Sequence, residues 1–272
     1  MIKNIKTPLR YPGGKSRAVK FLKNYFPETF IEYREPFFGG GSVGLYITQN
    51  NKNIKIKVND INYSLYSFWN TLKLFPNDMI NGIRMLKNKF DIGRELYNFI
   101  YSRRTSNISM LDNAIYFFIL NRITFSGLVD SGGYSERAFL ERFTNKSIEK
   151  LKEVYFVIKD FEFYSNDFPE LIQMNGDKVF IFLDPPYYST SNSKLYGKCG
   201  DLHKNFNHNK LYDLLSNTNH KFMLTYGNND YIKKIYRKFN IIEWNLQYGM
   251  NNYKQNKAAI GKELLICNYD IN

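Results

Sequence analysis

The feature that most constrains the fold is a strand, a glycine-rich turn, a helix and a second strand in direct succession. Residues 31–37 have the pattern of a strand, residues 38–42 are rich in glycine, and helical spacing of apolar residues follows from Val43. Residues 54–59 then alternate polar and apolar side chains, as a strand does, and end at Asp60. Glycines let a ligand approach the backbone at a helix N-terminus, and an acid about twenty residues further on typically binds ribose hydroxyls. This succession predicts a Rossmann-like α/β sheet and favours an adenosine-type cofactor.

A second constraint is the apolar run of residues 179–183, which is followed directly by Asp184, Pro185, Pro186 and Tyr187. A continuous apolar run that ends at prolines is typical of a buried strand in a parallel sheet. Asp184 then stands at the carboxyl end of the strand, where open α/β sheets bind their ligands. The prolines lack an N–H donor, so carbonyl oxygens of the turn can face outward as acceptors. These acceptors and the flat Tyr187 ring suit an exocyclic amino group, and an ordinary turn is the alternative.

The N-terminal loop contains an aromatic residue, two glycines and a cation in residues 11–15, and it precedes a helix for which Ser16 could be the cap. Such a loop could hold a carboxylate or a phosphate at the helix N-terminus. A plain turn explains the same residues equally well.

Residues 62–153 show apolar residues at helical spacing, which predicts a mostly helical insertion between the second and third strands of the sheet. The insertion contains Arg122, Phe125 and Tyr134 in polar segments with glycines. These side chains could combine hydrogen bonding with base stacking, or they could be the core of a helix–helix connection. The remaining residues, 1–61 and 154–272, are predicted to form the catalytic domain.

The catalytic domain continues with predicted strands at residues 161–164 and 222–226 and a closing hairpin of residues 241–246 and 263–269. Residues 189–205 are rich in Ser, Asn, Lys and Gly, and we expect them to form a loop that closes over substrate.

The charge balance, 38 basic against 25 acidic residues, makes a polyanion the first partner to consider. The chain is also rich in Asn and Ile, as A/T-rich genomes produce, so the basic clusters in residues 3–23 and 233–262 carry more weight than the total. Two separate basic clusters are consistent with a cleft whose two sides contact the phosphate backbone of a nucleic acid.

Several classes of protein are disfavoured by what the chain contains. The two cysteines, Cys199 and Cys267, have no metal-ligand spacing, so we expect neither a metal site nor a disulfide framework. The longest apolar run, residues 114–120, is too short to span a bilayer, and the N-terminus lacks the apolar region of a signal peptide. The sequence therefore predicts a cytoplasmic protein that binds no membrane.

With these motifs in order, the chain resembles the Dam-like (D12 class) DNA adenine-N6 methyltransferases. The segments that carry the resemblance are residues 8–15, 35–41, 59–60, 121–128, 167–168 and 184–187. The resemblance implies an S-adenosylmethionine-dependent enzyme that methylates the N6 amino group of an adenine flipped out of duplex DNA.

The resemblance also implies roles for individual residues. Asp184 and the Pro185 carbonyl would accept hydrogen bonds from the target N6, and Tyr187 would stack on the base beside Pro186. Asp60 would bind the cofactor ribose. The full set of implied cofactor contacts is Tyr11, Lys15, Glu35, Pro36, Phe37, Gly39, Gly41, Asp60, Asp167, Phe168 and Asp184. The implied or expected DNA contacts are Arg122, Phe125, Ser126, Tyr134, Lys254 and Lys257.

The insertion departs from Dam at Ser126, where Dam has an asparagine, and at Asp130, where Dam has a basic stretch. The GATC target of Dam is therefore not carried over. Cytosine-N4 methylation of DNA, RNA methylation and a catalytically inactive DNA-binding relative are the alternatives, and a restriction endonuclease acting on the same site is a possible partner.

Overall fold

The structure is a computed structural model, and it describes residues 4–104, 107–188, 206–247 and 260–271. The expected substrate loop at residues 189–205 and the expected DNA contacts Lys254 and Lys257 lie outside these ranges.

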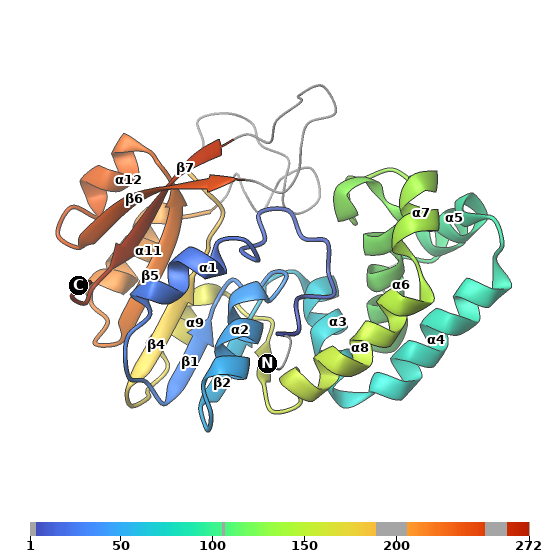
Figure 1. Ribbon diagram of the computed structural model, residues 1–272, viewed down its shortest axis with the longest axis horizontal. Coiled ribbons are helices and arrows are strands. Elements are labelled where there is room, and N and C mark those ends of the chain that lie inside the picture. The colour runs from blue at the N-terminus through green and yellow to red at the C-terminus, as the bar shows by residue number, and fades with distance from the viewer. Residues whose placement is uncertain (1–3, 105–106, 189–205, 248–259, 272) are drawn as a thin grey trace.

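Seven strands form one sheet within the described ranges, in the order β3-β2-β1-β4-β5-β7-β6 (Figure 1). Neighbouring strands from β3 to β5 run parallel, whereas β7 runs antiparallel to both β5 and β6. The strands are β1 (Glu32–Glu35), β2 (Lys55–Asn59), β3 (Glu162–Tyr164), β4 (Val179–Leu183), β5 (Lys221–Gly227), β6 (Asn240–Gln247) and β7 (Ile260–Cys267). The sheet confirms the predicted Rossmann-like α/β class and the closing hairpin.

The chain order reverses between β1 and β4, because the chain moves outward from β1 to β3 and then crosses to the other side of β1. The carboxyl ends of two such strands form the crevice in which open α/β sheets bind ligands. Glu35 ends β1 and Asp184 follows β4 directly, so both residues lie at this crevice.

Helices cover both faces of the sheet (Figure 1). One apolar cluster joins the sheet to α1 (Val19–Leu22) and α2 (Ser42–Asn50), and the other joins it to α9 (Phe168–Gln173), α11 (His208–Ser216) and α12 (Asp230–Ile235). In β4, Phe180 and Phe182 belong to the first cluster, while Ile181 and Leu183 belong to the second. Since successive side chains of a strand point to opposite faces, a strand covered on both faces is apolar without interruption.

The predicted cap at Ser16 is wrong, because the N-cap residue of α1 is Ala18. The helix begins at Val19 and continues into the short 3-10 turn η1 (Lys23–Tyr25). Ser16 Oγ instead lies 2.8 Å from Ser42 Oγ, at the start of α2. The chain turns between Lys15 and Val19, whose N–H donates to the Lys15 carbonyl at 2.9 Å.

The region between β2 and β3 consists mainly of helices, which form the lobe at the right of Figure 1. Phe68 of α3 and Leu151 of α8 belong to the same apolar cluster as the sheet, so one core joins this lobe to the rest of the molecule. The helices are α3 (Tyr63–Leu74), α4 (Pro76–Lys89), α5 (Gly93–Arg103), α6 (Met110–Ile123), η2 (Phe125–Gly127), α7 (Glu136–Arg142) and α8 (Asn145–Ile158).

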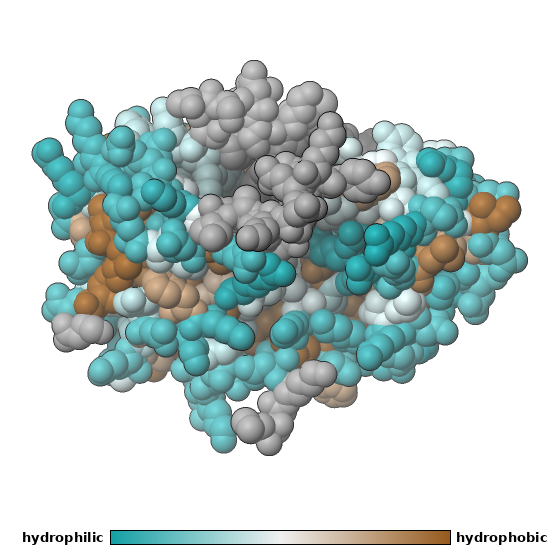
Figure 2. Space-filling view, turned by 45° about the horizontal axis from the view of Figure 1, so that its top comes forward, coloured by the Kyte–Doolittle hydropathy of each residue, from teal (hydrophilic) through white to brown (hydrophobic). Residues whose placement is uncertain are grey.

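Figure 2 shows that hydrophilic side chains cover most of the described surface on one side of the molecule, while hydrophobic ones gather in small groups. None of the described helices is both long enough and apolar enough to cross a bilayer.

Candidate active site

A cavity of about 520 Å³ lies at the carboxyl ends of the parallel strands. Its size is within the range of roughly 300–1,000 Å³ that is usual for small-molecule sites. The residues of this cavity include every cofactor contact expected from the sequence: Tyr11, Lys15, Glu35, Pro36, Phe37, Gly39, Gly41, Asp60, Asp167, Phe168 and Asp184. Residues that are distant in the sequence therefore meet at one site.

The glycine-rich turn leaves room for a ligand and for Tyr11 at the start of α2. Gly39 and Gly41 have φ angles of 50° and 68°, which are unfavourable for residues with a Cβ. A Cβ at Gly39 would lie 2.8 Å from Tyr11 Cε1, and one at Gly41 would lie 2.6 Å from Phe38 Cζ. Gly41, the N-cap residue of α2, supplies no capping side chain, and Glu35 accepts from Gly44 N in the first turn. The N–H groups of Ser42 and Val43 can therefore interact with a ligand.

Glu35 and Asp60 place two carboxyl groups at the cavity. Glu35 Oε2 accepts from the Tyr33 hydroxyl at 2.8 Å and from Gly44 N at 3.0 Å, and burial raises the pKa of Glu35 well above its usual range. Asp60 accepts from Gly39 N at 2.8 Å and from Asn62 N at 3.0 Å, and burial raises the pKa of Asp60 to about 6 in spite of these two bonds. A cationic ligand would favour the charged form of these two acids, which can also accept hydrogen bonds from hydroxyl groups.

Asp184 follows β4 and is held by two donors. Lys15 Nζ and the Thr225 hydroxyl each lie 2.8 Å from Asp184 Oδ1. Lys15 is 4% exposed and also donates to the Tyr187 hydroxyl at 2.9 Å. Asp184 Oδ2 has no hydrogen-bond partner in the described part of the chain, so this oxygen can accept from a ligand in the cavity.

An aromatic wall closes the side of the cavity next to α9. The ring centroids of Phe37, Phe168 and Phe206 lie 5.3 to 5.6 Å from one another. Asp167 caps α9 through Phe168 N and accepts from Lys210 Nζ at 2.9 Å. A wall of rings beside polar groups suits a flat ring system with hydrogen-bonding edges.

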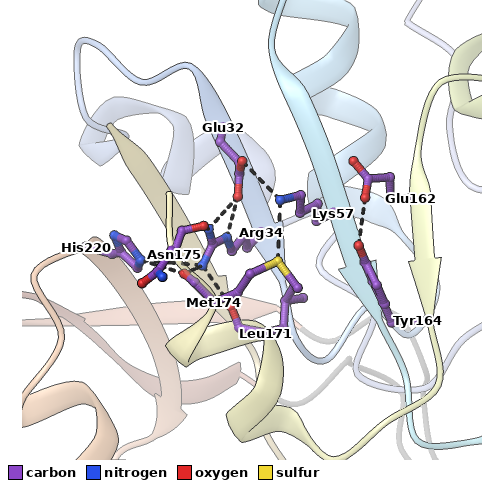
Figure 3. A network of polar contacts seen from close by, with 9 residues as sticks. All are labelled: Glu32, Arg34, Lys57, Glu162, Tyr164, Leu171, Met174, Asn175 and His220. Atoms are coloured by element: carbon purple, nitrogen blue, oxygen red, sulfur yellow. Dashed lines mark hydrogen bonds and ion pairs between the residues drawn. The ribbon is translucent and has the colours of Figure 1, made fainter. Parts of the chain in front are cut away.

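The other end of α9 is held by Arg34, which reaches from β1 to the carbonyl groups that end the helix (Figure 3). Its guanidinium donates to the carbonyls of Leu171, Met174 and Asn175 at 2.5 to 3.0 Å. Glu32 balances the charge at 2.6 Å. The buried pair therefore fixes the short helix that carries part of the aromatic wall.

The insertion is joined to the N-terminal loop by Asn121 of α6. Its side chain accepts from Arg10 N and donates to Arg10 O, both at 2.9 Å, and it also donates to Gly127 O at 3.0 Å. Leu128 and Asp130 of the insertion line the same cavity as Lys15. The expected recognition segment and the expected cofactor loop are therefore in direct contact.

Three arginines lie close to this contact between the insertion and the N-terminal loop: Arg10, Arg122 and Arg142. Burial, and to a smaller extent the charges of Arg10 and Arg142, lower the pKa of Arg122 to about 10. Arg122 Nε is buried without a hydrogen-bond partner among the described residues. Like charges in one place indicate a site for an anion.

The other expected DNA contacts have different surroundings. Phe125 in η2 is 60% exposed, and Ser126 follows it with a φ of 55°. Tyr134 is 6% exposed, its hydroxyl donates to Glu136 at 2.5 Å, and Arg94 lies over its ring. Tyr134 thus packs within the insertion in this structure, whereas the exposed side chain of Phe125 is available to a base without rearrangement.

Thr225 and Glu263 belong to the site, although no sequence motif identifies them. Thr225 and Glu263 are polar residues next to apolar runs in β5 and β7, and both are fully buried. A polar residue at a position predicted to face a core was therefore the available signal. In the described ranges, no group of three or more His, Cys, Asp or Glu side chains could hold a metal ion.

Comparisons with known proteins agree with this arrangement. Residues 11–250 match the family of D12 class N6 adenine-specific DNA methyltransferases. The type II methyltransferase M.MjaIII of Methanocaldococcus jannaschii is 27% identical to the chain and is aligned over 97% of this chain and 99% of its own length. The type II methyltransferase M.CviBI of Paramecium bursaria Chlorella virus NC1A is 23% identical, over 97% of this chain and 100% of its own.

The DNA N-6-adenine-methyltransferase of Escherichia phage P1 is 27% identical over 68% of this chain and 24% of its own length. The family match covers most of the chain and includes the glycine-rich turn, the insertion and the Asp-Pro-Pro-Tyr turn. The chain therefore belongs to the D12 class of N6 adenine-specific DNA methyltransferases.

Proposed function

We propose that the protein transfers the methyl group of S-adenosylmethionine to the N6 amino group of an adenine that is flipped out of duplex DNA. The observation that carries the proposal is the single cavity in which the expected cofactor residues meet Asp184, with one carboxylate oxygen of Asp184 left to accept.

The cavity fits S-adenosylmethionine at each of its parts. Glu35 and the start of α2 suit the ammonium and carboxylate groups of the methionine portion, respectively. Asp60 suits the ribose hydroxyls, and Phe37 and Phe168 suit the adenine ring. When bound, this cofactor supplies an electrophilic methyl group, whose bond to sulfur breaks as the bond to N6 forms.

Asp184 and the Pro185 carbonyl are the proposed acceptors for the amino group of the target adenine. The N6 lone pair is delocalised into the ring, so two acceptors that favour a pyramidal nitrogen make it more nucleophilic and stabilise its developing positive charge. Lys15 and Thr225 hold Oδ1 of Asp184, which directs Oδ2 toward the substrate. N6 releases one proton in the reaction, and Oδ2 is the proposed acceptor.

Tyr187 is the proposed stacking partner of the flipped base beside Pro186. Flipping costs a few kcal/mol, and stacking on an aromatic ring offsets part of that cost. Phe125 and Ser126 are proposed to enter the space that the base leaves, and Arg122 is proposed to contact a phosphate. The neighbouring charges of Arg10 and Arg142 support an anion at that position. The basic residues Lys254 and Lys257 stay predicted contacts.

Mass analysis of nucleosides tests the proposal directly. Unmethylated duplex DNA of mixed sequence is incubated with the protein and S-adenosylmethionine, and N6-methyladenine is expected in the digest. N4-methylcytosine in its place would support the cytosine-N4 alternative. If no methylated base forms and calorimetry detects no cofactor binding, the inactive relative is the better explanation.

The names of M.MjaIII and M.CviBI support a further part of the proposal, since both are type II methyltransferases. A restriction endonuclease that cuts the same DNA sequence is a proposed partner of this chain. Duplex DNA as substrate is also consistent with the cytoplasmic location predicted from the sequence.

A further inference from the structure

Glu263 is an unusual residue for its position in the sheet. It lies in β7 between β5 and β6, is 0% exposed, and is followed by the apolar residues Leu264, Leu265 and Ile266. Burying a carboxyl group costs free energy unless hydrogen bonds compensate for the lost water. A leucine would pack in the core at this position without that cost. The contacts of the Glu263 carboxyl group therefore indicate the role of this residue.

The Tyr187 hydroxyl donates to Glu263 Oε2. The same hydroxyl accepts from Lys15 Nζ at 2.9 Å, and Lys15 Nζ lies 2.8 Å from Asp184 Oδ1. The single proton of the phenol is therefore directed at Glu263, while an oxygen lone pair is directed at Lys15. A continuous series of contacts leads from Asp184 through Lys15 and Tyr187 to Glu263.

Gly227 and Glu263 both contact the Tyr187 side chain from one face of the sheet. Gly227 in β5 pairs with Glu263 in β7, and side chains at paired positions lie on the same face. A Cβ at Gly227 would lie 3.2 Å from Tyr187 Cδ2, so the ring occupies the space that the glycine leaves. Gly227 thus admits the ring, and Glu263 beside it takes the hydroxyl.

We propose that Glu263 is a positioning residue for methyl transfer, which holds the Tyr187 ring in the orientation that stacks the target base in front of Asp184. The inference rests on the proposed function, because it assumes that Tyr187 stacks on the base. Glu263 touches neither substrate nor cofactor in this account and acts through the hydroxyl of Tyr187.

A double-mutant cycle separates this role from a purely structural one. Glu263→Leu removes the acceptor and Tyr187→Phe removes the donor, so each is expected to lower the single-turnover rate at least tenfold. Both changes remove the contact between the Tyr187 hydroxyl and Glu263, and Tyr187→Phe also removes the contact with Lys15. The double variant is therefore expected to be no slower than Tyr187→Phe. The Michaelis constant for S-adenosylmethionine is expected to stay within twofold of wild type.

Two further variants serve as controls. Glu263→Gln keeps the size and a carbonyl acceptor, and it is expected to recover most of the rate lost in Glu263→Leu. Glu243→Leu changes a glutamate in the adjacent strand β6 whose side chain is 58% exposed, and it is expected to leave the rate unchanged. Losses that multiply in the double variant would overturn the proposal, as would wild-type rates in Glu263→Leu.

A measurement that needs no activity tests the contact itself. Carbon-13 labelling at Cζ of tyrosine gives a resonance for Tyr187, identified by its absence in Tyr187→Phe. This resonance is expected to shift in Glu263→Gln, because an amide replaces the carboxylate acceptor, even if Glu263→Leu fails to fold. An unshifted resonance would overturn the inference alone. A wild-type protein that methylates no DNA would instead overturn the proposed function and, with it, the catalytic part of the inference.

Discussion

Asp60 connects the electrostatics of the cavity to a pH dependence that can be measured. Burial raises the pKa of Asp60 to about 6 from an ordinary value of 3.8. Above pH 6 the carboxylate is charged and can accept from both ribose hydroxyls, whereas below pH 6 a proton occupies one oxygen. Binding that needs the charged form is therefore present above the raised pKa and is lost as the pH falls through it.

We expect the affinity for S-adenosylmethionine to be about tenfold lower at pH 5 than at pH 7.5, since each pH unit below the pKa lowers the charged fraction about tenfold. Titration calorimetry across this range measures the effect. Asp60→Ala is expected to bind more weakly throughout and to show no step near pH 6. A constant affinity of the wild-type protein from pH 5 to pH 7.5 would contradict the role of Asp60.

Phe125 is an exposed aromatic residue at the start of the expected recognition loop, and its side chain is 60% exposed. Phe125→Ala is expected to weaken binding to duplex DNA by about 1–3 kcal/mol, the usual contribution of an aromatic ring stacked on a base. Fluorescence anisotropy with labelled DNA measures this change. Phe156→Ala, at a 68% exposed position of α8, is the matched control and is expected to bind DNA as the wild type does. Equal affinities of the two variants would argue against a DNA contact at Phe125.

At the scale of elements, the short helix α9 depends on contacts at both of its ends. Asp167 and Phe168 at its start lie at the cavity, while Arg34 from β1 binds the carbonyls at its end (Figure 3). A helix of six residues has little stability of its own, so these contacts determine its position. The aromatic wall of the cavity therefore depends on a buried ion pair on the far side of the helix.

Arg34→Met is expected to lower the free energy of unfolding by about 3 kcal/mol, because it leaves Glu32 buried with less compensation. Denaturation by urea, followed by circular dichroism, measures the change. Arg137→Met removes an ion pair whose arginine is 83% exposed, and a change of at most about 0.5 kcal/mol is expected there. An Arg34 variant as stable as the Arg137 variant would show that the buried pair does not hold α9.

A second set of contacts between elements links the insertion to the loop that contains Lys15. Asn121 of α6 makes hydrogen bonds with both backbone polar groups of Arg10, and Arg10 Nη1 donates to the Thr124 carbonyl at 3.1 Å. Lys15, five positions further along the same loop, contacts Asp184. A shift of the insertion on DNA would therefore be transmitted to Lys15, which contacts the proposed catalytic carboxylate of Asp184.

At the scale of the whole molecule, local patterns in the sequence predict most of the fold. The run of residues 179–183 is apolar because β4 is covered on both faces, and the prolines after Asp184 end it. The glycine-rich turn and Asp60 likewise depend on residues that are close in sequence. Such signals predict that the expected cofactor contacts lie at one edge of the sheet before any long-range contact is known.

The remaining contacts depend on pairings that no local pattern specifies. Glu263 meets Tyr187 because β7 enters the sheet between β5 and β6 in a register that pairs it with Gly227. The predicted cap at Ser16 is wrong because the chain turns between Lys15 and Val19, and the residue types do not indicate this turn. Tyr134 lies in a segment that has the composition of a recognition loop, yet its ring packs within the insertion.

We expect the Asp184 turn to perform methyl transfer, while other parts of the molecule bind cofactor and DNA. Asp184→Ala removes the acceptor and leaves the rest of the cavity in place. We expect the rate of methyl transfer to DNA to fall at least about 100-fold, as for the loss of one group that stabilises developing charge. The dissociation constant for S-adenosylmethionine, measured by calorimetry on the same preparation, is expected to change by less than about threefold. Methyl transfer near the wild-type rate in Asp184→Ala would contradict the account.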